Sequence, residues 1–139
     1  MTEPRRLDHI AIAVRDTDAA LEYFCGRLGL VVASTEILET PALRLTYLDC
    51  GNAFIQLVEP LDDRSAVAES LALHGEGLHH ICFGVDDAVA EAIALADPGA
   101  PPPTIGQGRG RRSVFVPGPV HHGVRVECTA HEPFAAELP

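Results

Sequence analysis

Tryptophan is absent from this chain of 139 residues, and aromatic residues make up only 5% of it. Apolar residues nevertheless account for 47%, so a packed core is expected, built mainly from Val, Ile, Leu and Ala. A domain of this length buries roughly two-thirds of the surface that its unfolded chain exposes. We therefore expect a single globular domain over residues 1–139.

Positive charge is also scarce. Ten basic residues stand against twenty acidic ones, which gives a formal net charge of −10. Proteins that bind nucleic acids in general need Lys and Arg to displace counterions from phosphates, and anionic membrane surfaces attract the same residues. The composition therefore excludes nucleic acid and membrane surfaces as expected partners.

Long apolar runs and paired cysteines are missing as well. No run approaches the ~20 apolar residues of a membrane span, and the polar segment Met1–Arg6 does not resemble a secretory signal. The four cysteines are widely spaced and form no C-x-x-C pair, which favours free, mostly buried thiols in a reducing compartment. We expect a cytoplasmic protein.

What the sequence does contain is an internal repeat. Residues 7–14 read Leu-Asp-His-Ile-Ala-Ile-Ala-Val, and residues 78–85 read Leu-His-His-Ile-Cys-Phe-Gly-Val. Each segment is followed by acidic residues suited to cap a helix and then by a stretch rich in Ala and Leu. Both segments therefore predict a strand, a helix cap and a helix.

The rest of each repeat predicts three strands. Helices are expected at about 18–27 and 87–96, with a natural helix end at Gly29, and a linker helix within about 61–76. Strands are expected at about 31–37, 43–49 and 53–58, and again at about 103–105, 113–117 and 123–129. The Pro-rich run 98–103 suits a stiff loop. The predicted class is α+β, with two tandem β-α-β-β-β modules at about 6–60 and 77–131.

Four polar residues stand out in these apolar strands. Alternation places His9 on one face of its strand with only small residues beside it, and His80 is placed in the same way in the second copy. Small neighbours leave room, which a groove needs and a packed core avoids. Gln56 and Glu127 each interrupt a closing strand. His80 lies 71 positions after His9, and Glu127 lies 71 positions after Gln56, so all four share one repeat offset.

Two interpretations of this set compete. A single His on an apolar strand is more often a core histidine, and a single Glu is usually exposed or paired with a cation. The shared offset favours a metal site formed by His9, Gln56, His80 and Glu127. Two imidazoles, a carboxylate and an amide oxygen suit one divalent ion among Co, Ni, Mn, Fe and Zn.

The other histidines receive different interpretations. His79 alternates to the face opposite His80, so we expect it to support the site indirectly or to be structural. Four more lie in loops or near the end of the chain, where solvated surface is expected: His74, His121, His122 and His131.

At these residues the chain resembles the vicinal oxygen chelate superfamily of glyoxalases, bleomycin resistance proteins and dioxygenases, and within it the methylmalonyl-CoA epimerases. The resemblance covers residues 6–130 and is carried by residues 7–14, by Gln56-Leu57-Val58-Glu59-Pro60-Leu61, and by the run from 65 to 87 that contains Gly77-Leu78-His79-His80-Ile81. It implies a cupped mixed sheet around one metal ion, with His9, Gln56, His80 and Glu127 as ligands.

The resemblance implies an enzyme, an isomerase that epimerises a 2-methylmalonyl-CoA-type thioester by 1,1-proton transfer through a metal-stabilised enolate. Glu127 is the candidate for one proton-transfer role as well as a ligand. Some relatives carry a second carboxylate on the strand before the one with Gln56. Residues 43–48 contain no acid, so the second proton carrier stays unassigned.

The expected partner is an acyl-CoA or a similar chelating small molecule, and the resemblance implies a homodimer. Three arginines, Arg109, Arg111 and Arg112, are candidates to bind CoA phosphates, because a guanidinium group matches phosphate geometry. A solvated, flexible loop is the competing interpretation of that segment. Two other functions stay open: a different reaction on the same scaffold, such as glyoxalase-type isomerisation, another epimerisation or dioxygenation, and a non-catalytic binding or resistance protein.

Overall fold

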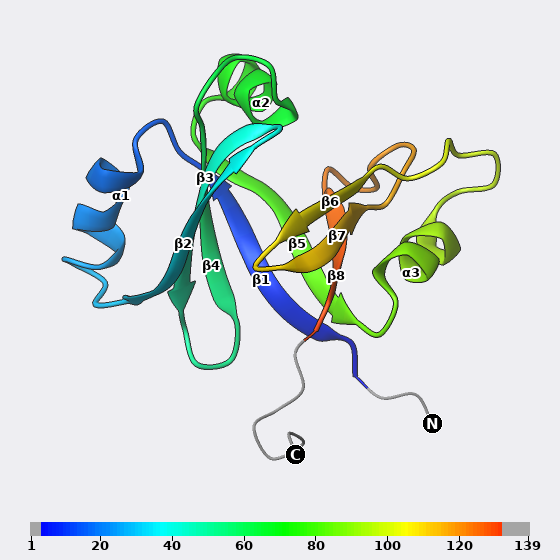
Figure 1. The fold of residues 1–139 in the computed structure, drawn as a ribbon, viewed down its shortest axis with the longest axis horizontal. Coiled ribbons are helices and arrows are strands. Elements are labelled where there is room, and N and C mark those ends of the chain that lie inside the picture. Colours follow the sequence, from blue (N-terminus) through cyan, green and yellow to red (C-terminus); the bar gives the residue numbers. More distant parts are fainter. Residues whose placement is uncertain (1–3, 132–139) are drawn as a thin grey trace. The chain divides into compact units, whose positions relative to one another are not determined.

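The computed structural model of the chain describes residues 4–131. Within these residues the element order is β-α-β-β-β, then one helix, then β-α-β-β-β again (Figure 1). The first set comprises β1 (Arg6–Ala13), α1 (Thr17–Phe24), β2 (Val31–Glu39), β3 (Ala42–Asp49) and β4 (Phe54–Pro60). Helix α2 (Ala66–His74) precedes the second set, which comprises β5 (Gly77–Val85), α3 (Ala88–Leu95), β6 (Ile105–Gly108), β7 (Arg111–Phe115) and β8 (Val126–Ala130). The predicted α+β class, with a mixed eight-stranded sheet, is confirmed.

The chain divides into two compact units that differ from the two halves of the element repeat. One unit is His9–Ile81, and the other, here called the C-terminal unit, combines Met1–Asp8 with Cys82–Pro139. Strands β1 and β5 therefore each contribute residues to both units. The module boundaries predicted near residues 60 and 77 stay predictions.

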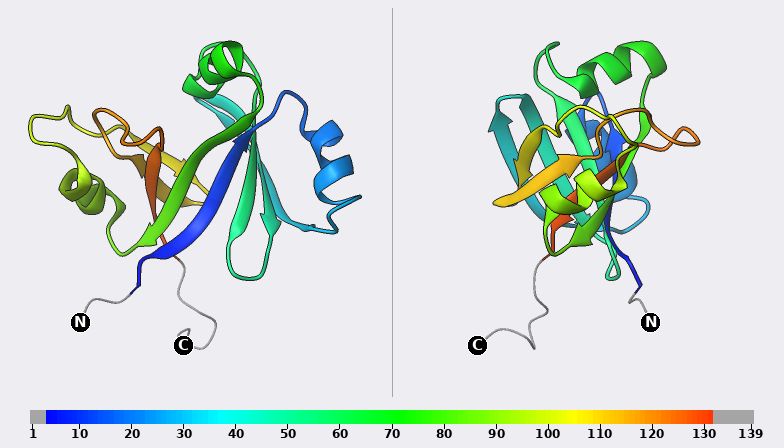
Figure 2. Two further views of the ribbon diagram at one scale, coloured as in Figure 1. Left: turned by 180° about the vertical axis from the view of Figure 1, so that it is seen from behind. Right: turned by 90° about the vertical axis from the view of Figure 1, so that its right-hand side faces the viewer.

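The first four strands are neighbours in the order β2-β3-β4-β1, and the last four repeat this order as β6-β7-β8-β5. Strand β1 pairs in parallel with β4, so that Ala11 lies opposite Gln56, while β3 pairs antiparallel with β4, so that Tyr47 also lies opposite Gln56. Figure 2 shows β1 and β4 side by side. Directly opposed residues share a sheet face, which places Ala11, Gln56 and Tyr47 on one face.

The helices begin where the sequence predicts. Asp16 caps α1 by accepting a hydrogen bond from the backbone N–H of Ala19, and Asp87 caps α3 through Ala90 in the same way. Helix α1 ends at Phe24, one turn before the predicted end. Gly29 still closes the segment as predicted, because it adopts φ +76° and donates its N–H to the carbonyl of Cys25 at 3.1 Å. No helix in residues 4–131 has the length and apolar character needed to cross a bilayer.

The segment carrying the three arginines is a hairpin, so the flexible-loop interpretation is wrong here. The strand predicted at about 103–105 exists, but it lies at Ile105–Gly108. Strand β6 begins at Ile105, immediately after the Pro-rich stretch, and pairs antiparallel with β7. Arg109 and Gly110 connect them with φ of +55° and +71°. Two consecutive left-handed residues form the tight turn whose twist suits a hairpin. The glycines of this segment hid the position of the strand, because they carry no side chain with strand preference.

The two faces of β1 pack against different elements. Ile12 packs in a cluster with Leu57 and helix α1, as the alternation predicts. Ala11 and Ala13 lie in another buried cluster that includes Val67 of α2. The prediction that these small residues leave open room is therefore wrong: side chains of β3 and α2 fill the space beside them.

Candidate metal and active site

His9 and His80 occupy equivalent positions in the two repeats. Each is the fourth residue of its strand, and β1 and β5 show the same succession of exposed and buried positions. The exposed fraction is 2% for His9 and 7% for His80. Their rings lie edge to face, with centroids 5.6 Å apart. The structure thus brings two predicted ligands together inside the His9–Ile81 unit.

Gln56 lies on the same face, 5% exposed, and is held by a residue that sequence reasoning missed. Its side-chain Nε2 donates a hydrogen bond to the hydroxyl of Tyr47 at 2.8 Å. The ring of Tyr47 also meets the ring of His9 edge to face, with centroids 5.7 Å apart. Tyr47 therefore joins Gln56 to His9. The available signal for Tyr47 in the sequence was its position in the predicted strand 43–49, on the face of Gln56.

The other end of the Gln56 amide provides the test of whether these residues suit a metal. Oε1 of Gln56 is buried and accepts no hydrogen bond from the residues that the structure describes. Leaving a buried carbonyl oxygen without a donor costs free energy, whereas a cation would satisfy it. Together with two buried imidazoles, this oxygen forms a donor set that suits a borderline divalent ion. The residues present therefore fit the predicted cofactor.

Glu127 is the predicted ligand that belongs to the C-terminal unit, where it is 7% exposed on β8. Within that unit it lies beside Cys82. Burial raises the pKa of the Cys82 thiol, and the charges of Glu127 and Asp8, with a hydrogen bond to Glu127, raise it further. Cys82 therefore stays a neutral thiol. His9, His80 and Glu127 are all buried residues able to hold a metal ion.

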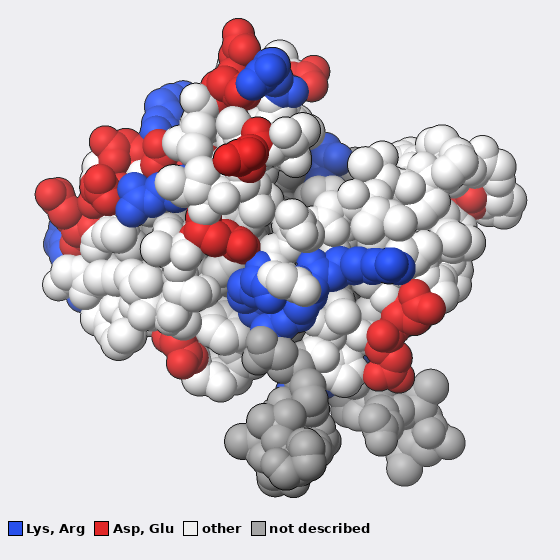
Figure 3. Space-filling view, viewed as in Figure 1, with Lys and Arg blue, Asp and Glu red and all other residues white. Residues whose placement is uncertain are grey.

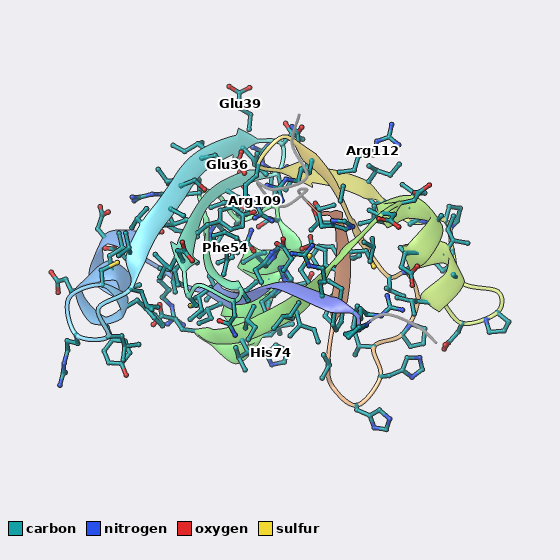
Figure 4. The ribbon with its side chains drawn as sticks, turned by 90° about the horizontal axis from the view of Figure 1, so that it is seen from below. Glu36, Glu39, Phe54, His74, Arg109 and Arg112 are labelled. Carbon is teal, nitrogen blue, oxygen red and sulfur yellow. The ribbon has the colours of Figure 1, made fainter. Side chains whose placement is uncertain are left out.

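Two of the three arginines are already engaged. Arg109 donates to the carboxylate of Asp8, and Arg111 lies 4.0 Å from the same carboxylate. The side chains of Arg109, Arg111 and Asp8 are nearly buried, at 10–13% exposure. Arg112 is exposed and extends away from the ribbon in Figure 4. Of the three, Arg112 is the one open to a ligand from solvent.

The sequence did not show on which face of the sheet Glu36 and Glu39 lie, but the strand register does. Strand β2 pairs Glu36 with Leu45, which shares the face of Tyr47 and Gln56. Glu39 pairs with Ala42 on the other face and projects into solvent (Figure 4). Glu36 is half-buried. As predicted, residues 43–48 of β3 contribute no carboxylate to this face, whereas β2 contributes Glu36.

The remaining histidines divide in two groups. His74, His121 and His122 are exposed, as predicted. His131 is half-buried, and its Nε2 lies 2.8 Å from the carboxylate of Asp86, so the prediction of a solvated residue is wrong for it. Its contact spans 45 positions of the chain and has no sequence signature.

A separate pocket of about 340 Å³ lies in the C-terminal unit. It is lined mainly by apolar side chains, among them Phe83, Val116 and Val126. Phe83 and Val126 are strand neighbours of Cys82 and Glu127 and so face the other side of the sheet. This pocket therefore contains none of the predicted site residues.

On the face drawn in Figure 3, acidic side chains are spread over several elements.

The family model of the Glyoxalase/Bleomycin resistance protein/Dioxygenase superfamily matches residues 8–115. The chain belongs to this superfamily. The ethylmalonyl-CoA/methylmalonyl-CoA epimerase of Cereibacter sphaeroides is a superfamily relative that is 33% identical over 96 residues, which cover 68% of this chain and 72% of that protein. For the human mitochondrial methylmalonyl-CoA epimerase the match is 33% identical and spans about half of that protein, 52%.

Solved structures agree with this membership of the superfamily. Streptomyces coelicolor methylmalonyl-CoA epimerase, in complex with 2-nitronate-propionyl-CoA, superposes with a TM-score of 0.76 at 35% identity, covering 92% of this chain and 95% of the other. A hypothetical protein of Bacillus halodurans superposes with a TM-score of 0.83 at 30% identity, covering 96% and 99%. The predicted resemblance to methylmalonyl-CoA epimerases, and with it the prediction of an isomerase-type enzyme, is confirmed.

Proposed function

We propose that this chain is a metal-dependent epimerase of a 2-methylmalonyl-CoA-type thioester. The observation that carries the proposal is the Gln56 amide, whose buried Oε1 accepts from no donor within residues 4–131 while Tyr47 fixes its other end beside His9. The names of the relatives support the substrate class. His9, Gln56 and His80 would hold the ion, with Glu127 as fourth ligand.

Epimerisation at C2 requires that one C–H bond breaks and a new one forms on the opposite face of the carbon. When the α-proton leaves, its bonding electrons move onto the thioester oxygen and an enolate forms. A divalent cation held by these residues would supply positive charge that stabilises this developing oxyanion. The nitronate ligand of the Streptomyces enzyme is a planar anion at the corresponding carbon, which supports an enolate as the intermediate.

Two groups must therefore exchange protons with C2, and we propose that both are glutamates. Glu127 takes one role, because it is buried on β8 and so retains little competing hydration. Glu36 takes the other role from β2, the strand next to the one on which the sequence resemblance sought an acid. It shares the sheet face of Gln56 and is half-buried.

For the CoA end of the substrate we retain the predicted arginines as a proposal. Arg112, which is exposed, would contact a phosphate directly, since guanidinium groups bind phosphate in a bidentate manner. Arg109 and Arg111, held by Asp8, would shape the hairpin that presents it. The predicted homodimer is likewise retained as a proposal.

One observation favours a different reaction of the superfamily. The face of β3 beside Gln56 carries Leu43, Leu45 and Tyr47, and so offers no carboxylate. If Glu36 does not reach the substrate, the site retains one carboxylate and suits a reaction that needs a single base.

The test is proton NMR of cobalt-loaded protein with (2R)-methylmalonyl-CoA in deuterated water. We expect deuterium at C2, a loss of at least about 100-fold in Glu127→Gln, and a comparable loss in Glu36→Gln. Glu39→Gln, on the outward face of the same strand as Glu36, serves as the matched control and should retain wild-type activity. No exchange despite bound cobalt would contradict the epimerase proposal. Normal exchange in Glu36→Gln would remove Glu36 from it.

A further inference from the structure

His79 and His80 are adjacent in β5 and make direct contact through their rings. The Nδ1 atoms of the two imidazoles lie 2.7 Å apart, and the ring planes cross at 80° with centroids 5.0 Å apart. A hydrogen bond of that length between two ring nitrogens requires one of them to donate and the other to accept. The pair is therefore restricted to complementary tautomers.

From this contact we propose that His79 is a positioning residue: it fixes the tautomer and orientation of His80 so that His80 offers Nε2 to the cation. The inference rests on the proposed metal site. A neutral imidazole binds a metal through the nitrogen that carries no proton, so ligation by Nε2 requires the proton of His80 on Nδ1. Nδ1 of His80 then donates to Nδ1 of His79, and His79 carries its own proton on Nε2.

Burial makes this assignment consequential. His80 is 7% exposed, and Nε2 of both rings is buried in the protein. In such an environment water is not available to stabilise the alternative tautomer, so the neighbouring ring decides it. Donation from Nδ1 also raises the basicity of Nε2 and strengthens it as a ligand. His9, whose ring centroid lies 5.6 Å from that of His80, has no such adjacent histidine in β1, where Asp8 takes the equivalent place.

The experiment compares His79→Phe, which keeps a planar ring but removes the acceptor, with His79→Asn, whose amide oxygen stands near the position of Nδ1. The first readout is the dissociation constant of cobalt(II), titrated into the protein by its visible absorption. We expect a 10- to 100-fold weaker affinity in His79→Phe and recovery to within about 3-fold of wild type in His79→Asn. The thermal midpoint of the metal-free protein, measured in parallel, should differ little between the two variants.

The second readout is independent of metal. Long-range ¹H–¹⁵N correlation spectra of the metal-free protein should show His80 protonated on Nδ1 in wild type and a mixture of tautomers in His79→Phe. Wild-type cobalt affinity in His79→Phe, or Nε2 protonation of His80, would overturn the role of His79 and leave the metal site standing. If His80→Ala abolishes no cobalt binding of the wild-type protein, the metal site is overturned, and the role of His79 with it.

Discussion

At the scale of single residues, the Tyr47 hydroxyl determines which end of the Gln56 amide remains available. Because the hydroxyl accepts from Nε2, the oxygen is left as the end of the amide that has no donor in the described part of the chain. An amide that was free to rotate would present either end. Fixing ligands through a neighbouring hydrogen bond is a general device of metal sites.

Tyr47→Phe tests this at the same scale. The variant keeps the ring that packs on His9 but removes the acceptor for the amide, so we expect cobalt affinity to fall about 10-fold. We expect a loss in unfolding free energy of about 1–2 kcal/mol, because a buried amide N–H loses its partner. Calorimetric titration and urea denaturation measure the two quantities. Unchanged affinity would show that Tyr47 does not orient the ligand.

The limits of sequence reasoning are visible in these residues. The alternation of strand faces every second residue correctly predicted that His9 and His80 are buried, because this prediction depends only on their positions in the strands. The same rule assigned His79 and His80 to opposite faces, and it could not show that their rings meet. The pair of Asp8 with Arg109 spans 101 positions, and no local pattern encodes such a contact.

At the scale of elements, a carboxylate on β4 anchors the start of α1. Oε1 of Glu59 accepts from the backbone N–H of Thr17 at 2.9 Å and from its hydroxyl at 2.7 Å. Thr17 is the first residue of α1 and is fully buried. A negative charge at a helix N-terminus also interacts favourably with the helix dipole. The contact therefore ties α1 to the strand that carries Gln56.

Glu59→Gln should weaken this link while preserving its shape. We expect the free energy of unfolding to fall by about 1–2 kcal/mol, since a neutral acceptor replaces a charged one. Urea denaturation measures the change. Glu69→Gln, at an exposed position in the first turn of α2, is the control and should change stability by less than about 0.5 kcal/mol. An equal effect in both variants would contradict the anchoring role.

Elements were predicted well where caps and apolar alternation coincide, as at Asp16 before α1 and Asp87 before α3. They were predicted poorly at β6, where Gly106 and Gly108 carry no strand preference and the turn depends on the left-handed conformation of Arg109. The positive φ of this arginine is set by the pairing of the strands around it. The residue types of the segment alone do not reveal that pairing.

At the scale of the whole molecule, folding is coupled to pH through buried thiols. Burial raises the pKa of Cys128 to about 11, and the charge of Glu91 adds to the effect. A thiol whose pKa is higher in the folded state stabilises the fold below its unfolded pKa of about 8.5. That contribution is lost as the pH rises toward 11. Cys82, shifted in the same direction, adds to the loss.

We therefore expect the free energy of unfolding to decline between about pH 9 and pH 11. Cys128→Val removes one of the titrating groups, so its decline should be shallower than that of wild type. Urea denaturation at half-unit pH intervals measures both curves, with Cys50→Ser, a change at an exposed thiol, as control. A wild-type slope in Cys128→Val would show that this thiol does not control the alkaline limit.

The repeat itself was the part of the whole molecule most accessible from sequence. The 71-residue offset that joins His9 to His80 and Gln56 to Glu127 corresponds to the doubled order of elements around α2. Its division into the two compact units was not accessible, because the contacts of Arg5 with Glu91 and of Asp8 with Arg109 draw the start of the chain to its second half.

The accessibility of Cys50 has a practical consequence. It is the exposed thiol among the four cysteines, and it directly follows Asp49, which pairs with Phe54, whose other neighbour is His9. A maleimide fluorophore attached there would sit two strands from the imidazole. Because cobalt(II) quenches nearby dyes by energy transfer, the fluorescence of the labelled protein would report cobalt binding near His9 without any substrate.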